Sequence, residues 1–392
     1  MENTSREFQV FVKPVGANCN LNCKYCYYLE KSTLYSSQRH ILMSKDILEK
    51  YLIQHIEAST EGTIHFSWHG GEPLLAGIDF YRSALKIQKA NKPAGKTILN
   101  GVQTNGTLLN QEWCRFLAEN GFVVGVSLDG PAEIHNLYRR TKNESRTFEN
   151  VCKGIQLLKE HHIMPEILCV VNSENVKYPN VTYEFFKRLG AEYITFIPLV
   201  IPDTTSPAGV TKSSVPAKEF GNFLVDIFDE WVEKDIGNIK IQIFEEAIRT
   251  AFSQEHTLCI FKVNCGAVPV VEQNGDFYSC DHYVNDAHFL GNISDNTLAF
   301  YLDSKRQIEF GMAKSLTLPK YCTECEVRSM CNGECPKNRF IFTPDGEYGL
   351  NFLCEGYKHF FNHCRPFVDA VAEAWRKEPH PPSPSPRGEG EK

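Results

Sequence analysis

The sequence predicts an α/β protein, a partial, open (β/α)6 barrel followed by a smaller cysteine-rich domain. Over the first 235 residues, six short apolar runs rich in β-branched residues alternate with helical patterns. Such alternation is typical of a parallel sheet with right-handed crossovers. From Cys259 onward the chain changes to short strands, turns and closely spaced cysteines. A doubly wound open sheet has the same alternation, so periodicity alone leaves that alternative open.

The expected elements follow one another in strict order. The expected strands are Phe8–Lys13, Thr63–Trp68, Thr97–Gln103, Val123–Leu128, Ile163–Val171 and Tyr193–Ile197. The expected helices between them are Lys45–Ala58, Phe80–Ala90, Gln111–Asn120, Phe148–Glu160 and Val181–Leu189. Polar or glycine-rich segments follow the strands, where parallel barrels bind their ligands.

Beyond the sixth strand, the helix Ala217–Lys234 and the segment Ile239–Ala251 are expected to lead away from the barrel. Asn274-Gly275, between two apolar runs, predicts a hairpin turn. We therefore divide the chain into a barrel (1–235), a connecting segment (236–258), a cysteine-rich domain (259–375) and a tail (376–392). The tail consists of Pro, Ser, Gly and charged residues, which predicts disorder.

Composition restricts the class of protein. With 392 residues, 42% of them hydrophobic, the chain can bury a large core. It has no apolar run of 18 residues and a polar N-terminus, so we expect a cytoplasmic protein without a membrane span or signal peptide. The net charge of −7 and the lack of a basic run argue against nucleic acid as a partner. Fifteen cysteines without an export signal indicate metal binding rather than disulfides.

Eleven cysteines form three spaced groups. The groups are Cys19-x3-Cys23-x2-Cys26, then Cys259-x5-Cys265-x14-Cys280, and Cys322-x2-Cys325-x5-Cys331-x3-Cys335 closed by Cys354. Thiolates at such spacings hold iron–sulfur clusters or zinc. The other four, Cys114, Cys152, Cys169 and Cys364, lie in predicted helices or a strand and read as small buried hydrophobes.

The first group holds only three thiolates, which leaves one iron of a cubane cluster free to bind another ligand. With Tyr25 before the third cysteine, this group resembles the signature of the radical S-adenosylmethionine (SAM) superfamily. The resemblance implies that the open iron chelates SAM and that an electron from the cluster splits SAM to a 5′-deoxyadenosyl radical. A structural zinc site is the alternative.

Further positions match SAM contacts of that superfamily. Gly70-Gly71-Glu72-Pro73 resembles the segment whose backbone and carboxylate hold the amino group of SAM, although such a sequence by itself is usually a plain turn. Ser127 and Arg139 match residues that bind the ribose and the carboxylate, and a guanidinium fits a carboxylate bidentately. Their alternative is a capping serine and a solvated arginine. Tyr25 and Leu199 match positions that contact the adenine.

The C-terminal cysteines resemble the SPASM domain of radical SAM enzymes that modify peptides and proteins. In that family the ligand sets interleave, which implies two auxiliary [4Fe-4S] clusters here, hence three clusters in the chain. The first set would be Cys259, Cys265, Cys280 and Cys335, and the second Cys322, Cys325, Cys331 and Cys354. Two zinc sites are the main alternative, because C-x2-C is equally a zinc motif.

Within the superfamily, roughly residues 8–370 resemble the anaerobic sulfatase-maturating enzymes. The matching segments are Lys13-Pro14-x-Gly16-x2-Cys19-Asn20, Gly70–Gly77, Gln103–Leu108, Cys169–Asn172, Phe196–Pro198 and Cys280–Tyr283. The resemblance implies oxidation of a cysteine or serine in a sulfatase, within a Cys/Ser-x-Pro-x-Arg sequence, to Cα-formylglycine. It also implies an electron donor such as ferredoxin or flavodoxin. His69 departs from the family, because some members carry glutamine there.

Asp281 is the candidate general base, since it follows a cluster cysteine and matches the family's assigned base. The alternative for this residue is a solvated turn aspartate. Two other functions stay open for the chain. A maturase that cross-links a small ribosomal peptide would often carry an N-terminal recognition domain, for which the position of Cys19 leaves no room. A non-catalytic iron–sulfur electron carrier would have no use for SAM-binding positions.

Overall fold

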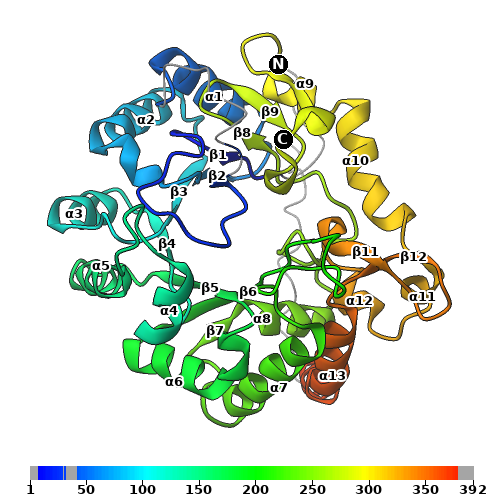
Figure 1. The fold of residues 1–392 in the computed structure, drawn as a ribbon. Helices are drawn as coiled ribbons and strands as arrows, with labels where there is room; N and C mark the ends of the chain where they lie inside the picture. The colour runs from blue at the N-terminus through cyan, green and yellow to red at the C-terminus, as the bar shows by residue number, and fades with distance from the viewer. Residues whose placement is uncertain (1–7, 30, 32–41, 378–392) are drawn as a thin grey trace.

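The computed structural model describes residues 8–29, 31 and 42–377. Ten strands form one sheet in the order β10-β9-β8-β1-β2-β3-β4-β5-β6-β7. The strands are β1 (Phe11–Val12), β2 (Thr63–Trp68), β3 (Thr97–Thr104), β4 (Val123–Ser127), β5 (Glu166–Val171), β6 (Tyr193–Pro198), β7 (Lys240–Ile241), β8 (Val270–Val271), β9 (Asp276–Tyr278) and β10 (Phe289–Asn292). In Figure 1 the sheet curves through the middle of the molecule and helices surround it.

The order of the first six strands distinguishes a partial barrel from a doubly wound sheet. Strands β1 to β6 are neighbours in sequence order and all pair in parallel. A doubly wound sheet would reverse its strand order at a switch point, and here the first six strands run on without a reversal. The predicted (β/α)6 barrel is confirmed. The register places Val12 beside Trp68 and Trp68 beside Val102, so the strands end at one rim.

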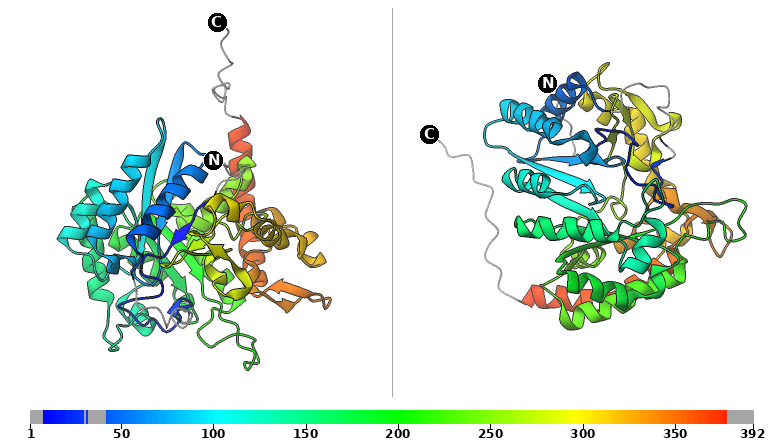
Figure 2. Two further views of the ribbon diagram at one scale, coloured as in Figure 1. Left: turned by 90° about the horizontal axis from the view of Figure 1, so that it is seen from above. Right: turned by 60° about the vertical axis from the view of Figure 1, so that its left-hand side comes forward.

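Helices lie outside the barrel strands and cover them, as Figures 1 and 2 show. They are α1 (Lys45–Ala58), α2 (Ile78–Asn91), α3 (Gln111–Glu119), α4 (Ala132–Tyr138), α5 (Phe148–Glu160), α6 (Pro179–Leu189) and α7 (Ala217–Lys234). Apolar side chains from both layers form the main core, which includes the fully buried Trp68, Tyr51 and Phe186. Helix α4 was not among the helices predicted from the sequence.

Boundaries differ from the expectations where proline or glycine intervenes. The fifth strand begins at Glu166 rather than Ile163, because Pro165 has no N–H to offer a neighbouring strand. Helix α6 begins at Pro179, a residue whose fixed φ suits the first turn of a helix. Gly77, at φ +80°, precedes α2, which begins at Ile78 rather than Phe80.

One prediction about the connecting segment is wrong. Residues 239–251 do not lead away from the barrel, because β7 pairs in parallel with β6 and extends the sheet by one strand. The segment continues as α8 (Gln242–Arg249) and a 3-10 turn (Thr250–Phe252). Two apolar positions, Ile241 and Phe244, bury this segment against the core.

The cysteine-rich part joins the same sheet at its other edge. Strand β8 pairs in parallel with β1, and the β8–β9 hairpin turns at Asn274-Gly275 as predicted. The remaining elements are α9 (Leu298–Leu302), α10 (Lys305–Leu316), α11 (Lys320–Thr323), α12 (Arg328–Cys331), β11 (Arg339–Phe342), β12 (Tyr348–Asn351) and α13 (Cys354–Lys377). The turn of this hairpin, residues 272–275, therefore lies beside the end of β1.

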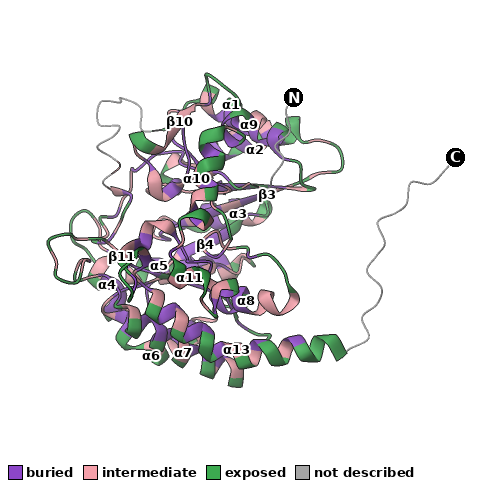
Figure 3. Ribbon diagram, turned by 90° about the vertical axis from the view of Figure 1, so that its right-hand side faces the viewer, coloured by how far each residue is buried: buried purple, intermediate pink, exposed green. Residues whose placement is uncertain are grey.

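The last helix, α13, packs along α7, with its buried positions on one face (Figure 3). Gly356 of α13 and Gly221 of α7 approach so closely that a Cβ at Gly221 would lie 2.8 Å from the Cα of Gly356. Arg376 and Lys377, which we expected in the tail, belong to this helix. The rest of the predicted tail, 378–392, lies outside the described residues. Over the part of the chain that is described, no helix is long and apolar enough to cross a membrane.

Candidate active site

The loop after β1 carries the first cysteine group across the rim of the barrel. Cys19, Cys23 and Cys26 are half-buried and close enough for their charges to act on one another. The sulfur of Cys19 accepts an N–H from Leu21 at 3.3 Å and one from the amide of Asn105 at 3.7 Å. Burial raises the pKa of Cys19 to about 11 and that of Cys23 to about 12. At neutral pH these cysteines would therefore be thiolates only when they bind a metal.

The Gly70-Gly71 loop after β2 clamps this cysteine loop through its backbone. The N–H of Gly71 donates to the carbonyl of Gly16 at 2.8 Å, and that of Glu72 to the carbonyl of Asn18 at 2.9 Å. A Cβ at Gly71 would lie 2.1 Å from the Asn18 oxygen. The glycine pair thus fixes the loop that leads into Cys19.

The Glu72 carboxylate is an anchor inside the protein. It is fully buried and accepts hydrogen bonds from the Leu74 N–H (3.0 Å), the Thr104 hydroxyl (2.8 Å) and the Asn105 N–H (2.8 Å). Burial raises its pKa to about 7, against the lowering effect of these bonds. Glu72 therefore ties the end of β2 to the end of β3, a role that the sequence analysis did not foresee.

We predict that Gly71→Ala removes most of the iron bound at the first cysteine group and lowers SAM cleavage by about a hundredfold. The new methyl group must push the Asn18 backbone away, and a displacement of about 1 Å at a reacting centre costs on this scale. Iron content and deoxyadenosine formation measure the effect. Gly62→Ala, at a position where a Cβ meets nothing within 4 Å, is the matched control. Normal iron in the Gly71 variant would contradict the prediction.

Arg139 and Tyr25 both contact Asp129, a residue to which no role was assigned from the sequence. The guanidinium of Arg139 forms a bidentate pair with Asp129, through Nε at 2.9 Å and Nη2 at 3.2 Å, and all three side chains are buried. The Tyr25 hydroxyl also donates to Asp129, and its ring lies 5.4 Å from the guanidinium. The charge of Arg139 acts on Cys23, so this cluster lies beside the first cysteine group.

The two remaining SAM-binding candidates lie at the ends of neighbouring strands. Ser127 ends β4 and is half-buried, and its hydroxyl accepts from the Gln103 amide at 3.2 Å. Leu199 follows β6, and its N–H donates to the Val171 carbonyl at 2.8 Å. Both therefore belong to the rim that carries the cysteine loop.

Asp281 lies at the same rim, in a buried network with residues far from it in sequence. Its carboxylate forms an ion pair with the Lys13 ammonium at 2.5 Å and accepts a hydrogen bond from Tyr27. Burial alone would raise the pKa of Asp281, but the Lys13 charge, with His282 and Tyr27, holds it well below its usual range. The carboxylate is thus ionised, with the Lys13 ammonium as its counter-charge. It is not the solvated turn residue of the alternative interpretation.

His69 and Glu272 border this network. The His69 ring stacks on Phe11 at 4.0 Å, and burial lowers its pKa to about 3, so it is neutral. The Glu272 carboxylate is fully buried, and burial raises its pKa to about 7. It accepts a hydrogen bond from Tyr28, whose ring lies 4.4 Å from the Lys13 ammonium. The sequence motifs included Lys13 without assigning it a role, and they did not include Glu272, which directly follows β8.

The C-terminal cysteines lie in two separate places. Cys322, Cys325, Cys331 and Cys354 line one cavity together with Gly333 and Lys358. The charges of Cys259, Cys265, Cys280 and Cys335 act on one another at a second place, since Cys259 interacts with Cys265, and Cys280 with Cys335 and Cys259. These are the two interleaved sets that the resemblance implied. Four soft thiolates at each place suit an iron–sulfur cluster.

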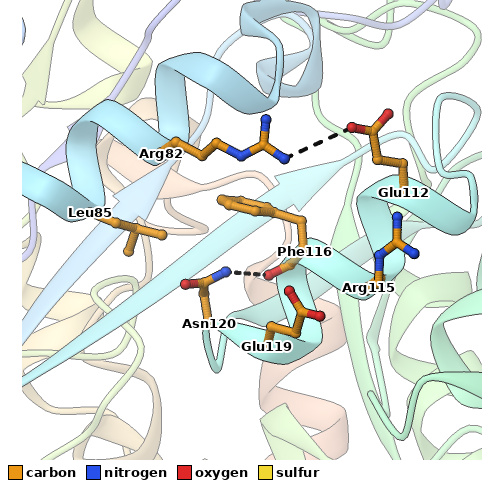
Figure 4. A pocket seen from close by; sticks show the side chains of 7 residues that line it. All are labelled: Arg82, Leu85, Glu112, Arg115, Phe116, Glu119 and Asn120. Carbon is orange, nitrogen blue, oxygen red and sulfur yellow. Dashed lines mark hydrogen bonds and ion pairs between the residues drawn. The ribbon is translucent and has the colours of Figure 1, made fainter.

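A larger cavity, of about 300 Å³, lies on the outer surface between α2 and α3 (Figure 4). Its charged residues, Arg82, Arg115, Glu112 and Glu119, balance one another, and Arg82 lies 4.0 Å from Glu112. It contains none of the cysteines and none of the rim residues. We assign it no part in the chemistry.

The fold and these cysteines define a radical SAM enzyme with a SPASM domain. A family model described as "Radical SAM superfamily" matches residues 14–187, and one described as "Iron-sulfur cluster-binding domain" (SPASM) matches residues 259–326. Such an enzyme uses SAM, a [4Fe-4S] cluster at the SAM site and additional clusters in the SPASM domain.

More specifically, the chain belongs to the anaerobic sulfatase-maturating enzymes. It is 44% identical to the "Serine-type anaerobic sulfatase-maturating enzyme" of Bacteroides thetaiotaomicron, over 93% of this chain and 91% of the relative. It is 33% identical to the "Cysteine-type anaerobic sulfatase-maturating enzyme" of Clostridium perfringens, over 93% and 98%. The solved structure "Native anSMEcpe with bound AdoMet and Cp18Cys peptide" is 32% identical, with a TM-score of 0.85 over 94% of this chain and all of that one. The predicted family and enzyme class are confirmed.

Proposed function

We propose that the rim of the barrel binds SAM on a cluster held by Cys19, Cys23 and Cys26. Support comes from the backbone clamp of Gly70-Gly71, which fixes the cysteine loop, and from the nearby candidates at the strand ends. The SAM contacts we propose are Tyr25, Gly70, Gly71, Glu72, Ser127, Arg139 and Leu199. Because the Glu72 carboxylate is fully buried and already accepts three hydrogen bonds, we assign its contact to its backbone. Arg139 retains the Nη1 donors of its guanidinium for a ligand carboxylate while Asp129 orients it.

We propose that the substrate is a sulfatase segment of the type Cys/Ser-x-Pro-x-Arg and that its first residue becomes Cα-formylglycine. When bound, SAM would supply the radical chemistry that removes a hydrogen atom from the substrate Cβ. Asp281 accepts the proton of the thiol or hydroxyl, and the C-terminal clusters, when bound, would take up the remaining electron. A serine then becomes the aldehyde directly, whereas a cysteine becomes a thioaldehyde that water hydrolyses to the aldehyde with release of hydrogen sulfide. The observation that carries this proposal is the buried, ionised Asp281 at the rim, held by Lys13 and Tyr27.

The partners follow from this chemistry. Each of the two C-terminal cysteine sets would hold one cluster. We keep the division of the chain into domains that was proposed from the sequence. An electron donor such as ferredoxin or flavodoxin must reduce the cluster held by Cys19, Cys23 and Cys26. We expect the enzyme to work in the cytoplasm, where such donors are found, and to bind neither nucleic acid nor a membrane.

The experiment is an anaerobic incubation of the reconstituted protein with SAM, a reductant and a peptide of this type. We expect deoxyadenosine together with an aldehyde at the first motif residue, detected by mass spectrometry and by reaction with a hydrazide. Peptides that begin the motif with cysteine and with serine are compared, and a peptide with alanine there is the control. Deoxyadenosine without a carbonyl on either peptide would contradict the proposal and favour a cross-linking maturase. No SAM cleavage at all would favour an electron carrier.

A further inference from the structure

Two buried cations lie between the two C-terminal cysteine sets. Lys314, on α10, is fully buried, and its ammonium donates to the backbone carbonyls of Cys259 at 3.0 Å and Ile260 at 2.7 Å. Arg339, at the start of β11, is 9% exposed. Its Nη1 donates to the carbonyl of Lys314 at 2.6 Å, so the two cations are joined through one peptide group.

The other hydrogen-bond partners of the Arg339 guanidinium are neutral carbonyls. It donates to the carbonyls of Gly333 at 2.8 Å, Asn332 at 3.0 Å and Glu334 at 3.1 Å. These carbonyls belong to the turn between Cys331 and Cys335. Gly333 also lines the cavity that Cys322, Cys325, Cys331 and Cys354 share. Arg339 is therefore packed behind the wall of the second cysteine set.

Neither cation is paired with a carboxylate in the described chain. The charge of Glu334 acts on both cations. Its buried carboxylate accepts hydrogen bonds from the amides of Asn338 at 3.0 Å and Asn351 at 2.5 Å instead. Two buried cations thus face one buried carboxylate. Buried charge without an opposite charge is costly, so such groups are normally paired.

When they bind clusters, the two cysteine sets would supply the negative charge that Lys314 and Arg339 lack. The Lys314 ammonium interacts with Cys265 and Cys259 of the first set. The Arg339 guanidinium interacts with Cys322 and Cys331 of the second set and with Cys265 of the first. Four thiolates around a cubane give a net negative charge, and one added electron makes it more negative. A nearby buried cation stabilises that reduced state and raises the reduction potential.

We propose that Lys314 and Arg339 are the counter-charges of the two C-terminal clusters and raise their reduction potentials, so that these clusters can take the electron left by the substrate. Lys314 acts on the cluster of Cys259, Cys265, Cys280 and Cys335, and Arg339 acts on both clusters. When bound, the clusters would take up the electron left on the substrate, and the two cations would stabilise the negative charge that it adds. This inference rests on the proposed function, which assigns these cysteines to clusters.

The test uses Lys314→Gln in the full chain, because glutamine keeps an N–H donor for the two carbonyls but has no charge. Iron per chain is measured first, and the midpoint potentials of the clusters are then followed by electron paramagnetic resonance during a redox titration. We expect the midpoint potential of the cluster held by Cys259, Cys265, Cys280 and Cys335 to be lower in the variant by about 59 mV. This corresponds to a change of about tenfold in the equilibrium constant for one-electron reduction. The N-terminal cluster should keep its potential.

Matched variants separate charge from shape. Lys314→Arg keeps the charge and should keep the potential, and Lys305→Gln, on the exposed side of the same helix, should change nothing. Arg339→Gln should lower both C-terminal potentials. Unchanged potentials in Lys314→Gln with full iron would overturn the inference. Loss of iron in both Lys314→Gln and Lys314→Arg would also overturn it, because it would show a role in shape alone; loss only in the glutamine variant would support it.

A second measurement needs no redox titration. Without iron, the Lys314 charge has no counter-charge, so the cluster-free Lys314→Gln chain should melt at the same or a higher temperature than the cluster-free parent. With clusters bound, the variant should melt at a lower temperature than the parent. If Lys314→Gln lowered the melting temperature both with and without clusters, or raised it in both states, the inference would be contradicted. If the parent itself binds zinc, or too little iron for two C-terminal clusters, the proposed assignment of the cysteines fails, whatever Lys314 does.

Discussion

Replacing Cys19, Cys23 and Cys26 together by alanine should abolish SAM cleavage and remove about a third of the iron from the reconstituted protein. All three side chains lie in one loop across the rim, and each one's charge acts on the others, so they form one site. The eight C-terminal cysteines lie at two other places and should still bind their clusters. Iron analysis and chromatography of deoxyadenosine measure both effects.

The control is Cys152→Ala, a half-buried cysteine on the outer helix α5 that belongs to none of the three groups. It should keep full iron and full cleavage. Two results would count against the assignment: residual SAM cleavage in the triple variant, or a loss of all iron rather than a third. Stoichiometric zinc in the C-terminal domain of the anaerobically purified parent would refute the two auxiliary clusters.

Asp281→Asn should separate radical formation from product formation. Asparagine has nearly the same size but cannot take up a proton, so the substrate thiol or hydroxyl stays protonated when the Cβ radical forms. We expect formylglycine to fall by about a hundredfold or more, the usual scale for the loss of a general base. Deoxyadenosine should still form, because the proposed SAM contacts at Gly71, Ser127 and Arg139 belong to other strand ends.

Both products are measured in one reaction after equal iron content has been confirmed, because Asp281 follows Cys280 directly. The matched control is Asp276→Asn, on the neighbouring strand β9, which hydrogen-bonds Asn274 and Asn292 rather than the rim. It should leave both products unchanged. Near-normal formylglycine in Asp281→Asn would show that this carboxylate orders the loop through Lys13 and Tyr27 and is not the base.

Many helices and strands could be predicted from the sequence, because their hydrophobic periodicity depends only on neighbouring residues. Helices α1, α5 and α7 and strand β2 begin and end where their hydrophobic periodicity predicts. Cysteine spacing likewise identified all eleven candidate ligands. Errors arose where short elements carry little periodicity, as in the two-residue strand β7 and the seven-residue helix α4.

The candidate site was only partly readable. Gly71, Arg139 and Asp281 were found as members of motifs, but the roles of Asp129, Lys13 and Glu272 were not foreseen. A buried ion pair between residues 13 and 281 has no signature in either segment, since each side chain is an ordinary charged residue in its own context. The same is true of Lys314 and Arg339, whose importance lies in what surrounds them.

The sequence by itself determined the α/β alternation and the three groups of thiols, because periodicity and spacing are properties of neighbouring residues. Its resemblance to known motifs indicated the family. Tertiary structure decided the rest. Parallel pairing of β1 with β2 brings Lys13 and His69 to one rim, and a buried ion pair joins Lys13 to Asp281. Folding of the C-terminal chain sorts eight cysteines into two places with two cations between them. Such contacts join residues far apart in the chain, and only the sheet register and the burial of charge determine them.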